Sequence, residues 1–103
     1  MTVKLTVVYG TPEDPDAFDQ HYRDVHMPLV GKWPGVERVE LAKVTGGPMG
    51  SPSPYHQIAE IWFADEDALN AALASEPGRE AGKDFMNIAT PGSFMTVSEV
   101  VPL

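Results

Sequence analysis

The chain has 103 residues, 43% of them hydrophobic, with fifteen acidic against seven basic side chains and a net charge of −8. This is the composition of one small globular domain, expected to span residues 1–103, with enough apolar surface for a single core. The acidic balance without a basic run excludes duplex nucleic acid and an anionic membrane surface as expected partners, because both require clustered Lys and Arg.

The first part of the chain predicts a strand followed by a helix. Residues 3–9 alternate apolar and polar side chains, which favours a strand. Asp14 followed by Pro15 is typical of a helix start. An apolar stripe at spacings of +4, +3 and +4 then predicts one buried helix face, formed by Phe18, Tyr22, Val25 and Leu29. Pro28 disfavours helical geometry in the residue before it, so we expect the helix to end near His26.

The middle of the chain predicts a hairpin and a second helix. Two strands, over 36–44 and 55–63, flank a loop rich in Gly, Pro and Ser. A helix is expected to begin at Asp65, which can cap it, and to be broken at Pro77-Gly78.

The last third predicts a further helical segment over 79–89, a turn over 90–92 and a strand over 93–101. The resulting order is βαββαβ. It favours a ferredoxin-like α+β fold, in which a four-stranded antiparallel sheet carries both helices on one face. Right-handed crossovers would place the first and third strands side by side in the middle.

The sheet face without helices is expected to carry several large side chains. The residues predicted there are Lys4, Thr6, Val8, His56, Ile58, Glu60 and Trp62. The second strand adds either Val39 and Leu41 or the residues that alternate with them. Glu60 is expected to form a structural ion pair with Lys4. Exposed apolar residues are common on protein surfaces, and that explanation stays open. We favour a second copy covering Ile58 and Trp62, which would give a homodimer with two sheets packed as a barrel-like sandwich.

Candidate chemistry concentrates in residues 21–30, HYRDVHMPLV. Tyr22 and His26 are four apart, so their side chains neighbour each other on one helix face. His26 is the candidate acid–base residue, and Tyr22 can orient it or donate a hydrogen bond to a substrate carbonyl. Alternatively, His26 only satisfies a free carbonyl of the last helical turn, because Pro28 offers no N–H to Asp24.

A metal site is not expected. His21 and His26 are five residues apart, about 140° around a helix, which is a poor spacing for two ligands of one ion. The chain has no cysteine, which excludes thiolate ligands and thiol nucleophiles and fits a cytoplasmic protein. No apolar run is long enough to cross a bilayer, and the first residues lack the basic start and apolar stretch of a signal peptide.

These residues resemble a known family. The pattern Y-x-x-x-H-x-P-L at 22–29, the Pro-Gly turn at 34–35 and the strand PYHQIAEIWF at 54–63 are similar to the EthD family of the dimeric α+β barrel superfamily. The family is named after an ethyl tert-butyl ether degradation protein. The resemblance implies a homodimer of ferredoxin-like subunits, with a pocket between the sheet and the first helix. It also implies that His26 acts in that pocket, with Tyr22 beside it.

Two functions follow as hypotheses. The first is a cofactor-independent enzyme, with His26 and Tyr22 as catalytic residues, for proton transfer, dehydration, cyclisation or oxygenation. Its substrate would be an apolar aromatic or polyketide-like carbonyl compound of a degradation or secondary-metabolite pathway. The expected ligand-binding residues are Tyr9, Phe18, His21, Phe63 and Phe85. The second is an accessory protein that binds such a ligand unchanged for an oxygenase. A haem-associated oxidative role, as in distant superfamily relatives, is a third possibility.

Overall fold

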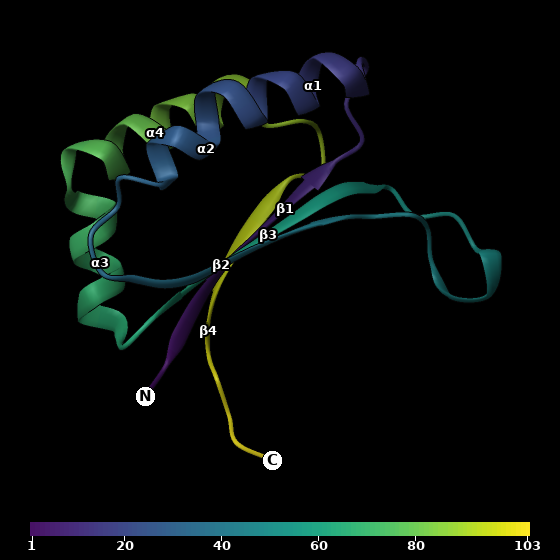
Figure 1. Cartoon of the computed structure of the whole chain (residues 1–103). Helices are drawn as coiled ribbons and strands as arrows, with labels where there is room; N and C mark the ends of the chain where they lie inside the picture. The colour runs from purple at the N-terminus through teal and green to yellow at the C-terminus, as the bar shows by residue number, and fades with distance from the viewer.

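A computed structural model describes all 103 residues as one four-stranded antiparallel sheet covered on one face by helices (Figure 1). The strands run in the order β2-β3-β1-β4. Their bounds are β1 (Val3–Gly10), β2 (Val36–Lys43), β3 (Tyr55–Phe63) and β4 (Phe94–Glu99). The first and third strands are central, and the ferredoxin-like fold class is confirmed.

The helical segments lie on the same side of the sheet (Figure 1). The first crossover contains α1 (Pro15–His21), η1 (Tyr22–His26) and α2 (Met27–Val30), and the second contains α3 (Glu66–Ala74) and α4 (Glu76–Ile88). A short 3-10 turn, η2 (Pro48–Gly50), lies in the loop between β2 and β3. No helix is long and apolar enough to cross a membrane.

The core lies between the helices and one face of the two central strands. β1 and β3 pair so that Val3 faces Phe63, Leu5 faces Ile61 and Val7 faces Ala59, and all six side chains are buried. The two helix starts predicted from the sequence are confirmed: Asp14 accepts a hydrogen bond from the N–H of Ala17, and Asp65 accepts one from Ala68.

The first helix does not end at His26, and this expectation is wrong. The chain stays helical to Val30 through one wider, π-helical turn at η1, in which the N–H of Met27 donates to the carbonyl of Tyr22 five residues back. Pro28, which has no N–H to donate, then lies in the first turn of α2. The wider turn therefore lets the helix continue past proline.

The same turn changes which side chains face the core. Val25, expected in the buried stripe, is 43% exposed. The residues buried along the helix follow one another at intervals of four and are Phe18, Tyr22, His26 and Val30. The extra residue in the turn rotates the following side chains, so that His26 takes the inward position that a regular helix would give to Val25.

The second crossover breaks at Ser75, not at Pro77-Gly78 as expected. The Ser75 hydroxyl donates to the carbonyl of Ala72 (2.5 Å) and accepts from the N–H of Gly78 (3.1 Å), so one residue terminates α3 and caps α4. Pro77 lies in the first turn of α4, where its missing N–H needs no partner. As a result α4 begins three residues earlier than the predicted segment.

The residues that alternate with Val39 and Leu41 along β2 lie on the helix-free face of the sheet. Val39 and Leu41 pair with Ile61 and Ala59 and so belong to the helix side. On the other face, Trp62 lies beneath the side chains of Arg38, at 4.7 Å, and Lys4, at 5.5 Å.

The ion pair predicted on that face is confirmed, since Lys4 Nζ lies 2.6 Å from Glu60 Oε2. His56 departs from its predicted place there. Its Nε2 lies 2.8 Å from Asp19 Oδ1, and its ring contacts Phe18 edge-on, so it faces the first helix.

Candidate functional site

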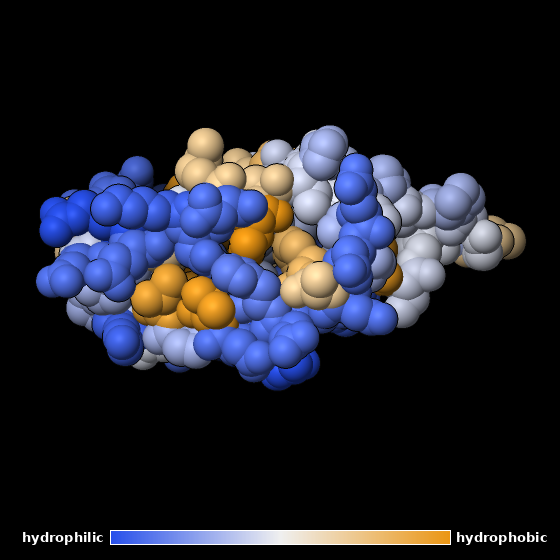
Figure 2. Space-filling view, turned by 90° about the horizontal axis from the view of Figure 1, so that it is seen from above, coloured by the Kyte–Doolittle hydropathy of each residue, from blue (hydrophilic) through white to orange (hydrophobic).

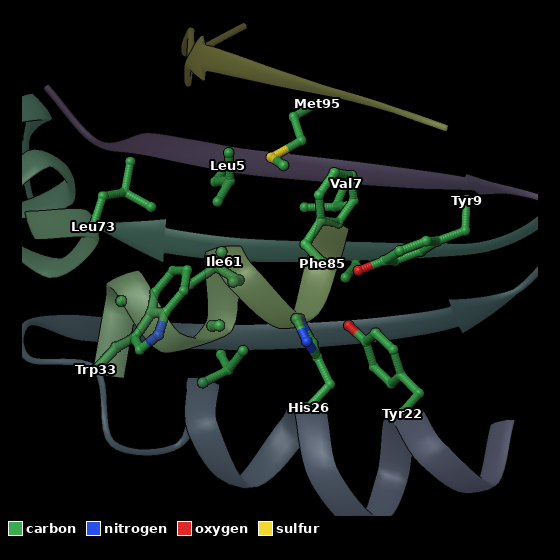
Figure 3. A pocket seen from close by; sticks show the side chains of 15 residues that line it. Leu5, Val7, Tyr9, Tyr22, His26, Trp33, Ile61, Leu73, Phe85 and Met95 are labelled. Atoms are coloured by element: carbon green, nitrogen blue, oxygen red, sulfur yellow. The ribbon is translucent and has the colours of Figure 1, made fainter. Parts of the chain in front are cut away.

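A cavity of about 60 Å³ lies between the helix side of the sheet and the two crossovers that cover it (Figure 3). Twelve of its fifteen lining residues are hydrophobic; among them are Leu5, Val7, Val30, Trp33, Ile61 and Phe85. This volume holds only a few water molecules, so an organic ligand must displace side chains to enter. Leu73 and Met95 line the cavity and are 37% and 46% exposed, so they form part of its wall that reaches the surface.

The surface above the helices is mostly hydrophilic, with small hydrophobic areas visible between the charged side chains (Figure 2). The interior of the cavity is thus far more apolar than the surface around it.

Three polar groups meet at one end of this cavity. The rings of Tyr22 and His26 are 4.9 Å apart and those of Tyr9 and Tyr22 are 5.6 Å apart. The two tyrosine hydroxyls point toward each other beside the imidazole (Figure 3). Burial raises the pKa of Tyr22 to about 12. Burial, with smaller effects from Tyr22 and Asp84, raises the pKa of Tyr9 well above its ordinary value. Both hydroxyls therefore remain protonated donors at neutral pH.

His26 is fixed by a carboxylate from the other crossover. Its Nδ1 lies 2.8 Å from Oδ2 of Asp84 on α4, and the His26 side chain is only 8% exposed. A carboxylate accepts, so Nδ1 donates to Asp84, and in the neutral form of the ring Nε2 is then the acceptor. Nε2 has no hydrogen-bond partner within the protein, while His26 lines the cavity. His26 does not cap a free carbonyl of its own helix, which was the alternative.

Asp84 also bonds to the second histidine of the motif. Its Oδ1 lies 2.8 Å from His21 Nε2, so one buried carboxylate bridges two imidazoles that are five residues apart on the first helix. His21 does not line the cavity, and its side chain is 37% exposed. No group of three or more His, Cys, Asp and Glu side chains is placed to hold a metal ion.

The remaining expected ligand-binding residues divide into two groups. Tyr9 and Phe85 line the cavity beside His26. Phe18 lies behind the site, with its ring 5.2 Å from that of Tyr9 and 6.0 Å from that of Tyr22. Phe63 is completely buried in the core and does not line the cavity.

Asp84 is the residue that sequence reasoning missed. Ala81, Phe85 and Ile88 are apolar residues of α4 at helical spacing, and Asp84 falls between them, three residues after Ala81. An acidic residue on the buried face of an amphipathic helix is unusual, because a buried charge needs a partner. That position was the available signal.

The chain was compared with known proteins. A family model described as the EthD domain matches residues 11–92. A relative from Rhodococcus erythropolis, described as an uncharacterized 11.0 kDa protein in the thcB-thcC intergenic region, is 35% identical over 96 residues, covering 93% of this chain and 92% of the relative.

Two solved structures have the same fold. An EthD family protein from Bacillus halodurans C-125 is 34% identical, with a TM-score of 0.91, covering 98% of this chain and 100% of the other. SnoaB, a cofactor-independent oxygenase from Streptomyces nogalater, has a TM-score of 0.73 and 15% identity, covering 99% and 95% of the two chains. The likeness to SnoaB is one of fold.

Proposed function

The chain belongs to the EthD family, and we propose that it is a cofactor-independent enzyme that moves a proton next to the carbonyl of an apolar compound. The observation that carries this proposal is the orientation of His26. Its Nδ1 is held by Asp84, and its Nε2 is left without a partner in an apolar cavity. A neutral imidazole arranged in this way can act as a general base toward a bound C–H group.

The proposed step needs only groups of this chain. His26 Nε2 takes the proton from the carbon next to the carbonyl, and the electron pair of that C–H bond moves onto the carbonyl oxygen. The protonated hydroxyl of Tyr22, with that of Tyr9 beside it, donates a hydrogen bond to the developing oxyanion. Asp84 stabilises the imidazolium that forms. Isomerisation, dehydration, cyclisation and reaction with oxygen can all begin from such an enolate.

The expected substrate class follows from the lining. Apolar and aromatic side chains surround one polar end, which suits an aromatic or polyketide-like carbonyl compound. SnoaB is an oxygenase that needs no cofactor, which supports chemistry of this kind on the same fold. We further propose that the protein acts in the cytoplasm as a homodimer, in a degradation or secondary-metabolite pathway.

The test is hydrogen exchange in D₂O, with acetophenone and larger aromatic ketones as probes. The wild type should replace the hydrogens next to the carbonyl faster than buffer does, as followed by NMR. His26→Gln should fall to the buffer rate while keeping the circular dichroism spectrum and melting temperature of the wild type. His56→Gln is the matched control, because His56 bonds to Asp19 and does not line the cavity.

Two outcomes oppose the proposal. Undiminished exchange by a folded His26→Gln variant would reject the role of His26. A probe that raises the melting temperature of the wild type but keeps its hydrogens would favour the accessory ligand-binding function instead.

A further inference from the structure

The inner face of α4 leaves the space that forms the cavity. The residues of this helix that line the cavity are Gly78, Ala81, Gly82 and Phe85, which follow one another as a single helical stripe. Three of these four have no side chain larger than a methyl group. At Gly82 the space is open, because the residue is exposed and an added Cβ atom would meet no atom within 4 Å. The cavity therefore reaches the surface beside Gly82.

Neither packing nor backbone geometry requires glycine at position 82. At Gly78 an added Cβ atom would collide with the carbonyl of Ala72, whereas at Gly82 it would collide with nothing. Gly82 lies inside α4 and does not have a positive φ. Glycine within a helix lowers stability relative to alanine. The fold alone therefore does not explain the absence of a side chain at this position.

Gly82 and Asp84 lie on opposite edges of α4. Two residues along a helix are about 200° apart, so the edge with Asp84 faces His26 and the edge with Gly82 faces away from it. On that other side lies β4, where Met95 pairs with Val7 of β1 and so shares the helix side of the sheet. Met95 and His26 lie at opposite sides of the cavity (Figure 3). The opening beside Gly82 is thus remote from His26.

The opening is bordered by apolar side chains. Met95 of β4 and Leu73 of α3 line the cavity and are both exposed, whereas the lining residues Tyr9 and Tyr22 at the other end are buried. We call the opening formed by Leu73, Gly82 and Met95 the Gly82 mouth. None of its three residues is charged, so an apolar group can lie in it without displacing water from a charge.

The span of the cavity indicates the length of its ligand. The lining crosses three neighbouring strands, β3 at Ile61, β1 at Leu5 and β4 at Met95. Neighbouring strands lie about 4.8 Å apart, so the cavity floor extends over roughly 10 Å from β3 to β4. A ketone with one aromatic ring is shorter than this span, whereas a ketone with two linked rings reaches across it.

We propose that the ligand enters through the Gly82 mouth and that position 82 determines which ligands fit. The ligand is an elongated apolar ketone. Its carbonyl end reaches His26 and Tyr22, a placement that rests on the proposed function, and its far end lies between Leu73 and Met95. The missing side chain at Gly82 leaves room for this far end. A ketone with one ring does not extend into the mouth and gains nothing from the glycine.

An introduced thiol tests where the far end lies. The chain has no cysteine, so the thiol of Gly82→Cys would be its only one. Lys83→Cys is the control, because Lys83 is exposed on the same helix and does not line the cavity. Labelling by iodoacetamide is followed by mass spectrometry with saturating acetophenone or 4-acetylbiphenyl. The two-ring ketone should slow labelling of Gly82→Cys several-fold and acetophenone should not, while neither should protect Lys83→Cys.

A second variant tests the mouth through affinity. Gly82→Leu fills the open space, so its binding of 4-acetylbiphenyl in an NMR titration should weaken about tenfold, which corresponds to losing the burial of roughly one apolar side chain. Its binding of acetophenone should not change, and Lys83→Leu should bind both ketones like the wild type. A Gly82→Cys thiol that 4-acetylbiphenyl leaves unprotected, equal protection by the two ketones, or undiminished binding of 4-acetylbiphenyl by folded Gly82→Leu would each overturn the mouth.

Failure of the mouth differs from failure of the proposed enzyme. Hydrogen exchange that depends on His26, in a protein whose thiol at position 82 is never protected, would keep the enzyme and reject the mouth. Protection of that thiol by 4-acetylbiphenyl, without hydrogen exchange of either ketone, would keep the mouth as the entrance to a binding site and reject the enzyme.

Discussion

His26 is held in place by its own helix and by a carboxylate 58 residues away in the sequence. The pairing of Tyr22 with His26 was predictable, because residues four apart on a helix neighbour each other. The partner Asp84 was not, because its contact depends on how α4 packs against the first helix. Spacing within one helix predicts that Tyr22 neighbours His26, whereas the tautomer of His26 depends on its tertiary contact with Asp84.

The contribution of Asp84 can be measured by Asp84→Asn. An asparagine keeps the size but can donate as well as accept, so it no longer holds the proton on Nδ1. We expect the rate of ketone exchange to fall on the order of 10²-fold or more, by analogy with the orienting aspartate of catalytic triads. Asp24→Asn, at an exposed carboxylate with a side chain 55% exposed, is the control and should keep the wild-type rate. Equal rates for the two variants would remove Asp84 from the mechanism.

At the scale of elements, the π-helical turn η1 decides which residue faces the cavity. The sequence predicted the strands and the helix starts, because alternation and capping residues are local signals. It failed at Pro28, where the rule that helices end before proline competes with continued packing of the helix on the sheet. The wider turn settles that competition and places His26 in the core, with Val25 outside. Turns of this kind are frequent at functional sites.

The element that supplies Asp84 depends on one glycine. A Cβ atom at Gly78 would lie 2.0 Å from the carbonyl oxygen of Ala72, because α3 ends directly against the start of α4. We expect Gly78→Ala to lower the free energy of unfolding by several kcal/mol, since this contact is with backbone and cannot relax cheaply. Urea unfolding measures the loss.

Gly82→Ala provides the matched control four residues later in the same helix. Nothing lies within 4 Å of a Cβ atom at Gly82, so the substitution should be neutral or stabilise by up to about 1 kcal/mol through helix propensity. A Gly78→Ala variant as stable as Gly82→Ala would contradict the close approach of α3 to α4.

At the scale of the whole molecule, the sheet has helices on one face only (Figure 1). The fold class was predictable from the order of elements and the handedness of crossovers. How the open face covers its apolar side chains was harder to predict from the sequence. The long side chains of Arg38 and Lys4 lie over the ring of Trp62. The aliphatic stems of Lys and Arg side chains can cover an aromatic ring in a single subunit and still pack against another subunit.

A homodimer through this face is testable with one substitution. Ile58 lies on the open face and is partly exposed, so Ile58→Asp would place a charge between two packed sheets. We expect the wild type to sediment at twice the subunit mass of 11.2 kDa and Ile58→Asp at the single mass. Val25→Asp, on the exposed side of the helix, should stay dimeric. A wild type that sediments as a monomer would rule out this assembly.

The tautomer of His26 is the most direct test of the proposed chemistry. Nitrogen NMR of the ¹⁵N-histidine-labelled protein at about pH 8, where an ordinary imidazole is neutral, distinguishes the two ring nitrogens. The contact with Asp84 predicts a proton on Nδ1 of His26 and a bare Nε2, whose signal shifts when an aromatic ketone is added. A proton on Nε2, or an Nε2 signal indifferent to every ketone that binds, would contradict the assignment of His26 as the base.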